Sequence, residues 1–263
     1  MTVPRSPIQW NGQLGPDGPG GRKRPPSAAS AVAPGEVLPG LEQRVRSLER
    51  RKRAFDRSAD AADAAGAATR GGPFPGYYER ATFVSFRLDG LQTTEGEVAA
   101  ALARGAANRA CRSRSSQRVR NHVAALRHVE SLLARGRPLE SGHVVRWYAS
   151  VACGLSYGHI DGQTAARIGQ VCSTMNSPQL RLRPAVREIA ALHVRLLADP
   201  FVPGFNGIVA RLLLRYHLGR CGLPPVLFHP ETDAANLASE AALLPRLLDL
   251  ILESYEATEA ARS

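Results

Sequence analysis

The stretch ADPFVPGFNGIVARLLLRYHL, Ala198 to Leu218, sets a turn containing glycine and proline directly before a segment rich in leucine and arginine. The segment upstream, RPAVREIAALHVRLLADPF, repeats apolar residues at steps of three and four, at Val186, Ile189, Leu192 and Leu196. That spacing places the four side chains on one face of a helix. The stretch therefore predicts two helices joined by a short turn.

Other segments of the chain share this helical character. Ala, Leu and Arg are plentiful and aromatic residues make up only 6% of the chain, which favours helices packed through aliphatic side chains over a sheet. Helical spacing recurs in EGEVAAALARGAA, SSQRVRNHVAALRHVESLLARG, ESGHVVRWYASVACGLS and EAALLPRLLDLILESYEA. We therefore expect an all-α protein.

The sequence divides into three parts. Residues 1–36 are rich in Pro, Gly, Ser and Ala and contain a short basic segment, GRKRPP. Such a composition cannot bury enough apolar area to offset chain entropy, so we expect disorder there. Residues 37–70 are expected to form a helix and a linker, since apolar side chains recur at near-helical spacing from Leu41 to Phe55. The break GGPFPG then precedes a helical domain expected over residues 77–257.

The chain is strongly basic, with a formal net charge of +11. One interpretation is that arginine simply serves as a solvated residue on helix surfaces. The other is an anionic partner, because the basic N-terminal tail and the cluster RACRSRSSQRVR, Arg109 to Arg120, could bind nucleic acid through electrostatics alone. The charge by itself leaves both interpretations open.

Membrane and metal sites are not expected. The N-terminus lacks the apolar core of a signal peptide, and no run approaches the roughly 18 apolar residues of a membrane span, so we expect a soluble, cytoplasmic protein. The cysteines are far apart and form no CxxC pair, which argues against a metal site. They are Cys111, Cys153, Cys172 and Cys221.

The turn after Ala198 is suited to receive an anion. Glycine lets backbone amides approach a ligand, and the first amides of the following helix are unsatisfied donors at the positive end of its dipole. Arg211 lies one turn further along, within side-chain reach, and its guanidinium matches the geometry of a phosphate. Residues of these types also occur in ordinary turns between helices, so the chemistry stays open at this point.

The same passage resembles the signature of the Fic (Fido) family, HPFx[D/E]GNGRxxR, which lies between two helices. Asp199-Pro200-Phe201 stands where HPF would, and Arg211 stands where the second arginine would. Gly204, Asn206 and Gly207 stand where GNG would, with one inserted residue, Phe205. The segment ARLLLRYHLGRCGLPPVLF is similar to the family's continuation after the motif, and the resemblance spans residues 82–257.

The resemblance also extends to a regulatory motif of the family, (S/T)xxxE(G/N), whose glutamate pairs with the second arginine and blocks nucleotide binding. The segment LQTTEGEVAA places Glu95 and Gly96 at the Glu-Gly position, although Leu91 stands where Ser or Thr would. Glu95 is then a candidate inhibitory residue with Arg211 as its partner. Alternatively, Glu95 is a first-turn residue that the helix dipole stabilises.

The resemblance implies a Fic-like helical bundle and an activity. Fic domains typically transfer AMP from ATP to a hydroxyl group of a target protein, with the motif histidine as base and the motif acid holding magnesium. It implies a phosphate site at Gly204, Asn206, Gly207 and Arg211, with ATP or another nucleotide as ligand and a protein as target.

The chain departs from the family at the positions that carry the chemistry. Asp199 stands at the base, and a solvated aspartate with a pKa near 4 is a poor proton acceptor. Pro203, at the acid, offers magnesium no ligand, although Asp199 is an oxygen ligand of the type magnesium prefers, and Ile208 replaces the first arginine. His193 lies six residues before Asp199, which is poor geometry for a substitute base.

We therefore expect a degenerate Fic-fold protein that lacks ordinary AMP transfer and acts by binding a nucleotide or a protein. One alternative is a divergent transferase in which Asp199, Asn206 and Arg211 handle a different phosphorylated donor. A second alternative is a basic helical protein that binds nucleic acid.

Overall fold

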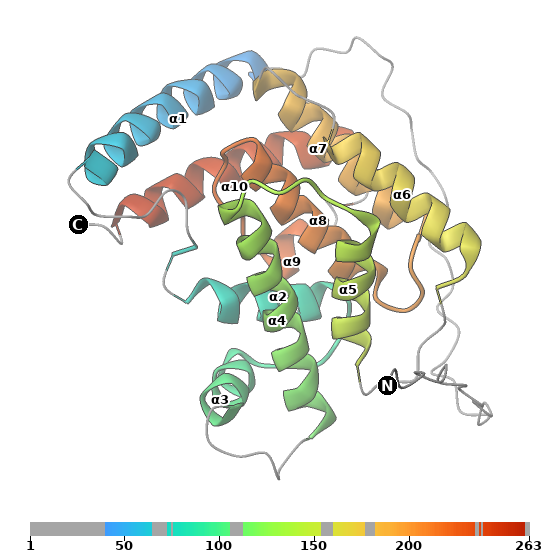
Figure 1. Cartoon of the computed structure of the whole chain (residues 1–263). Coiled ribbons are helices and arrows are strands. Elements are labelled where there is room, and N and C mark those ends of the chain that lie inside the picture. The colour runs from blue at the N-terminus through green and yellow to red at the C-terminus, as the bar shows by residue number, and fades with distance from the viewer. Residues whose placement is uncertain are drawn as a thin grey trace, which may run out of the picture. The chain divides into compact units, whose positions relative to one another are not determined.

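The computed structural model describes residues 40–64, 73–74, 76–105, 113–153, 160–176, 182–234, 237 and 239–260. Over these ranges the chain is all-α, as predicted, with ten helices and no strand (Figure 1). The helices are α1 (Leu41–Ala64), α2 (Tyr77–Leu88), α3 (Glu95–Gly105), α4 (Arg114–Ala134), α5 (Ser141–Ala152), α6 (Gly162–Asn176), α7 (Leu182–Ala198), α8 (Asn206–Arg220), α9 (Pro230–Asp233) and α10 (Glu240–Ala260).

Every described residue belongs to one compact unit of the chain, within residues 32–263. The disordered tail expected over residues 1–36 lies outside the described residues and stays a prediction.

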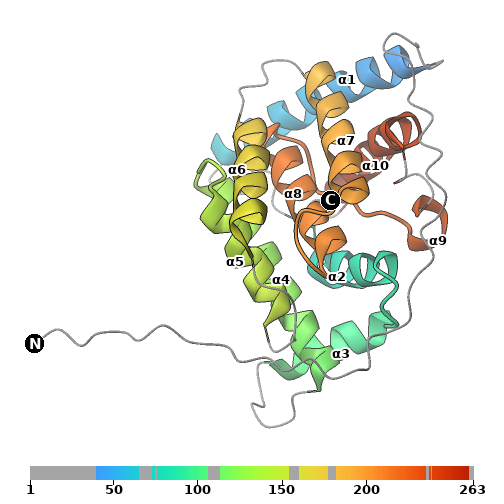
Figure 2. The same ribbon diagram turned by 90° about the vertical axis from the view of Figure 1, so that its right-hand side faces the viewer.

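Helix α8 is the centre of the fold. Apolar residues occur on all of its sides, and every residue from Ile208 to Leu218 is buried except Arg211. A helix that is apolar all round is stable only when other helices cover it. Helices α2, α4, α5 and α7 pack against α8, and Figures 1 and 2 show it enclosed among them.

Two apolar clusters flank this central helix. One cluster is formed by residues of the five helices from α2 through α6 together with residues of α8. In it the large buried side chains of Trp147 and Tyr216 lie with their ring centroids 6.3 Å apart. The other joins α1, α7 and α10, with Phe55 of α1 packed edge-on against Tyr255 of α10 at 5.1 Å. The regularly spaced apolar residues of α1 therefore form the face of the helix that packs on α10.

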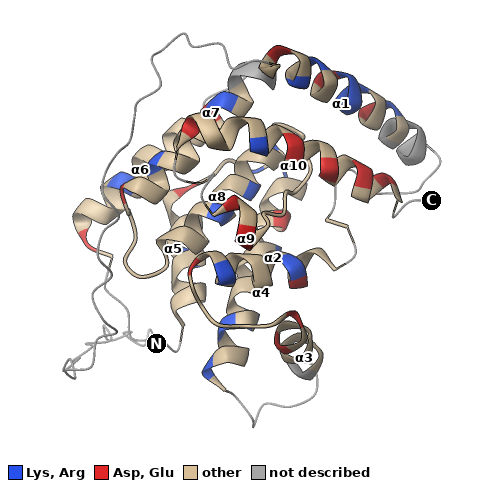
Figure 3. Cartoon of the chain, turned by 180° about the vertical axis from the view of Figure 1, so that it is seen from behind, with Lys and Arg blue, Asp and Glu red and all other residues tan. Residues whose placement is uncertain are grey.

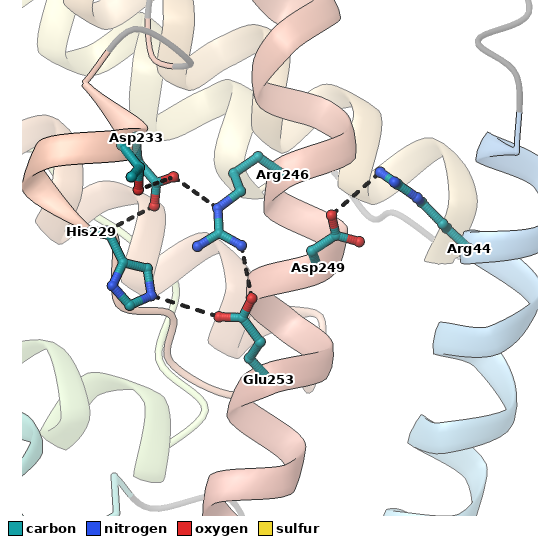
Figure 4. Close-up of polar contacts among 7 residues, drawn as sticks. Arg44, His229, Asp233, Arg246, Asp249 and Glu253 are labelled. Carbon is teal, nitrogen blue, oxygen red and sulfur yellow. Dashed lines mark hydrogen bonds and ion pairs between the residues drawn. The ribbon is translucent and has the colours of Figure 1, made fainter.

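Ion pairs join α10 to its neighbours (Figure 4). Arg246 donates to the buried Asp233 of α9 at 2.8 Å and to Glu253 at 2.7 Å, and Arg44 of α1 lies 3.4 Å from Asp249. Burial alone would raise the pKa of Asp233, but hydrogen bonds from Arg246 and from the backbone N–H of His229 outweigh it and lower that pKa. This network holds α9 against α10.

Candidate anion site at the head of helix α8

The turn between α7 and α8 is held by buried apolar side chains. Phe201, Val202 and Phe205 are all buried, and Gly204 adopts a φ of 76°, a left-handed conformation that favours glycine. The inserted Phe205 thus gives the turn a third core anchor and stands at the N-cap of α8. The Phe205 side chain has no hydrogen-bond acceptor, so the first backbone N–H groups of α8 donate no hydrogen bond to the N-cap side chain.

Asn206 closes the turn with its side chain. Its amide nitrogen donates to the carbonyl of Leu196 at 2.6 Å, and its amide oxygen accepts from the backbone N–H of Phe201 at 3.0 Å. Both ends of the amide are engaged within the protein. Asn206 therefore fixes the end of α7 to the start of α8.

Arg211 binds the end of α2. Its Nε donates to Ser85 Oγ at 2.8 Å, and its Nη2 donates to the Ser85 carbonyl at 2.7 Å and to Asp89 Oδ1 at 2.5 Å. The Arg211 side chain is 10% exposed and that of Asp89 is 18% exposed, so little water screens this ion pair. The guanidinium is therefore already matched by a carboxylate of the same chain.

The carboxylate of Asp89 also lies against the first turn of α8. A Cβ atom added at Gly207 would come closer to Asp89 Oδ1 than real Cβ contacts allow, and it would lie 3.1 Å from Nη1 of Arg211. The first turn of a helix carries partial positive charge from its amides, so a carboxylate is stabilised there. The space beside the first turn of α8 is thus taken by a carboxylate of the protein itself.

Asp199 has a different partner. Its carboxylate forms an ion pair with Arg167 of α6, which also donates to the carbonyl of Pro200 at 3.2 Å. The Asp199 side chain is 75% exposed, and it lies with Arg167 along a groove between α6 and α7. Asp199 therefore helps to attach the turn to α6, whereas Arg211 attaches α8 to α2.

Two buried histidines lie near Arg211. Burial, and secondly the charge of Arg211, lowers the pKa of both His122 and His193 to about 3, so both rings are neutral. His122 forms a hydrogen bond of 2.9 Å with Thr82 Oγ1, and His193 stacks on Phe228 at a ring distance of 6.2 Å. Their contacts are those of core residues.

A small cavity lies beside the ion pair. Its volume is about 40 Å³, and Ser85, His122, Arg211 and Arg215 contribute to its lining. A space of this size holds one or a few water molecules but excludes a nucleotide. A nucleotide phosphate could reach the head of α8 only if Asp89 moved away.

The described residues offer few ligands for a metal. They contain no group of three or more His, Cys, Asp or Glu side chains arranged to hold one. At the position of the family's magnesium-holding acid, Pro203 has no ligand to offer, and Asp89 and Asp199 are both paired with arginine. These residues do not fit the magnesium site that the resemblance implies.

None of the described helices has the length and apolar character required to cross a membrane.

Solved structures share this arrangement of helices. The chain superposes on a Fic-domain-containing signalling protein from Bacteroides thetaiotaomicron with a TM-score of 0.57 and 16% identity, covering 85% of this chain and 98% of the other. It superposes on Fic-1 from C. elegans with a TM-score of 0.64 and 17% identity, covering 84% and 72%. The chain has the Fic fold. No protein-family model matches the sequence, and no curated protein matches it.

One carboxylate faces Arg211 at the end of α2. Of the two interpretations of Glu95, the structure fits the first-turn residue, because Glu95 lies exposed at the start of α3 and the carboxylate bound to Arg211 is that of Asp89. The sequence contained a signal for this residue, because Ser85, Asp89 and Gly90 have the spacing of (S/T)xxxE(G/N) with aspartate in place of glutamate. Gly96 has open space around it and takes no part in the contact.

Proposed function

We propose that this protein binds a nucleotide through its phosphates at the head of α8, in exchange for the carboxylate of Asp89, and does not carry out ordinary AMP transfer. The single observation that carries the proposal is the position of Asp89, which pairs with Arg211 and occupies the space beside Gly207. In this conformation the protein is closed, and its own carboxylate competes with the ligand.

Arg211, which pairs with Asp89, and the free first-turn amides of α8 beside it suit a phosphate as well. A guanidinium and the first-turn amides of a helix bind any compact oxyanion, and a phosphate carries more charge and more acceptor atoms than a carboxylate. Gly207 lets an anion approach the backbone closely, since a side chain there would fill the space that Asp89 now takes. Asn206 and the buried Phe205 keep this surface rigid from behind.

The groups that would transfer AMP are not assembled around this surface. Asp199 stands at the base position and is paired with Arg167, while Ile208 stands at the first arginine and is fully buried. Loss of a general base alone commonly lowers a rate by roughly 10²- to 10⁴-fold. We therefore expect binding of ATP without transfer of AMP.

Calorimetry with ATP tests the proposal, with and without magnesium. Asp89→Asn keeps the shape of the side chain but removes its charge, and it should bind ATP at least about tenfold more tightly than the wild type because the competing anion is gone. Arg211→Gln in the Asp89→Asn background should abolish that gain. Asp249→Asn, at an ion pair between α10 and α1, is the matched control and should leave ATP binding unchanged.

Two results would contradict the proposal. If Asp89→Asn, shown to be folded by circular dichroism, binds ATP no better than the wild type, the head of α8 is not a nucleotide site. If labelled ATP instead modifies the protein or a target, and the modification disappears in Asp199→Ala, the protein is a divergent transferase.

A further inference from the structure

Helix α1 carries a row of arginines on its outer face. Arg46, Arg50, Arg53 and Arg57, here called the arginine stripe, follow one another at steps of four, three and four residues. Those steps keep the four side chains on one face of a helix, and all four residues are exposed. With a rise of 1.5 Å per residue, the stripe extends over about 16 Å.

The remaining basic residues of α1 serve the fold. Arg44 pairs with Asp249 at 3.4 Å, and Arg51 pairs with Glu259 at 2.6 Å, so both attach α1 to α10. Lys52 pairs with Asp56 of its own helix at 2.7 Å. Of the basic side chains of α1, Arg44 and Arg51 therefore stabilise its packing on α10, Lys52 pairs within the helix, and the four stripe arginines face outward.

Three of the four stripe arginines form no ion pair with the residues that the structure describes. Arg46 has only a contact of 4.0 Å with Glu42, and Arg50, Arg53 and Arg57 form no ion pair or hydrogen bond with a described residue. Like charges three and four residues apart repel one another. Residues 41–58 carry seven basic and three acidic side chains, so the helix keeps a surplus of four positive charges (Figure 3).

The chemistry of the stripe selects among polyanions. All four cations are guanidinium groups, which bind phosphate oxygens in a bidentate manner. The side chains that border the stripe are small on one side, at Ser47, Ala54 and Ser58, and acidic on the other, at Glu42, Glu49 and Asp56. They include no large apolar group that could insert into a bilayer. Phe55, the only aromatic residue of α1, is buried against Tyr255, so nothing on this face could stack on the bases of a single strand.

The geometry points to the arginine stripe of α1 as a binding surface for the phosphate backbone of double-stranded DNA, without reading of the base sequence. A duplex presents closely spaced phosphates along its whole length, and a straight helical row of cations can contact several of them at once. This surface is separate from the head of α8, so its role does not depend on the proposed function.

Fluorescence anisotropy with a labelled DNA duplex of about 24 base pairs and the full chain tests the inference. If the stripe contacts four phosphates, the logarithm of the affinity falls with the logarithm of salt concentration with a slope of about −3.6, which is roughly a 100-fold loss between 50 and 200 mM salt. Replacing all four stripe arginines by glutamine should remove most of that slope. Replacing Arg87, Arg135, Arg137 and Arg146, which are exposed on other helices and loops, lowers the net charge equally and should leave the slope nearly unchanged.

The outcomes separate the inference from its rivals. It is overturned if the two fourfold variants lose affinity equally, if the stripe variant still binds as the wild type does, or if the wild type binds phosphatidylserine vesicles and not the duplex. Should the fourfold stripe variant fail to fold, the double variants at Arg46 with Arg50 and at Arg53 with Arg57 replace it. Each should lower the slope by about half, and an unchanged slope in both overturns the inference.

Discussion

The carboxylate of Asp89 lies 2.5 Å from the guanidinium of Arg211, although 122 positions of sequence separate the two residues. The same carboxylate oxygen occupies the space beside Gly207, so one side chain at the end of α2 pairs with the cation and also covers the first turn of α8. This ion pair holds two helices together and at the same time covers the surface that would receive a phosphate. Its strength therefore decides how readily the surface opens.

Removal of Arg211 should destabilise the protein more than removal of Asp89. Arg211→Ala leaves a largely buried carboxylate without its cation, and we expect a loss of about 3 kcal/mol in the free energy of unfolding. Asp89→Ala leaves Arg211 bound to Ser85, so its cost should be smaller, about 1 kcal/mol. Urea unfolding of both variants and of the double variant gives the coupling energy directly, and a coupling near zero would show that the pair is not formed in solution.

Gly207→Ala tests whether Asp89 occupies the head of α8. The new methyl group would meet the carboxylate of Asp89, so we expect a loss of about 1 kcal/mol and weaker pairing with Arg211, despite alanine's higher helix propensity. In the Asp89→Ala background the same substitution should become neutral or stabilising. Gly96→Ala is the control, since nothing lies near its added methyl group and only the propensity gain remains. Equal effects of Gly207→Ala in both backgrounds would contradict the observed contact.

The sequence predicted what depends on local patterns. The apolar spacing from Val186 to Leu196 predicted α7, and the glycine and proline residues after Ala198 predicted the turn, because these features depend on neighbours in the chain. The order of several segments along the chain, which resembles that of the Fic family, predicted the fold. The closure of the turn by Asn206 could not be predicted from the sequence, because it depends on where two backbone groups outside the helix pattern point in the folded chain.

The identity of the carboxylate that pairs with Arg211 could not be predicted from the sequence for a different reason. Glu95 and Asp89 are both acidic residues followed by glycine, and they are only six positions apart. Which of the two faces Arg211 depends on where α2 ends and on how the loop after Leu88 turns away toward α3. Periodicity fixes the face of a helix but not its last residue, and that residue decides which carboxylate meets the arginine.

Loss of Arg167 should loosen the turn without unfolding the protein. The ion pair of Arg167 with Asp199 is exposed, so Arg167→Ala should cost less than about 1 kcal/mol in global stability. The bond from Arg167 to the carbonyl of Pro200 is lost as well, and we therefore expect faster amide hydrogen exchange over residues 199–205. Asp199→Asn keeps the backbone bond and should leave exchange in the turn near the wild-type rate. If Asp199→Asn loosens the turn as much as Arg167→Ala does, the carboxylate rather than the backbone bond holds it.

Acid should destabilise the protein through its buried histidines well before its carboxylates titrate. In the unfolded chain His122 and His193 take up protons near the ordinary pKa of 6.5, whereas in the folded protein their pKa values are lowered to about 3. Between these two values the unfolded state binds the additional protons, so the free energy of unfolding falls by about 1.4 kcal/mol per pH unit for each histidine as the pH decreases. Above pH 6.5 the two residues should contribute no pH dependence. Urea unfolding of the wild type and of His193→Gln at pH 7, 6 and 5 checks this, because the variant should lose about half of the slope that the two histidines produce. An unchanged slope in a folded variant would mean that the ring of His193 is accessible to protons in the native state, and that the core beside Arg211 is less closed than its burial indicates.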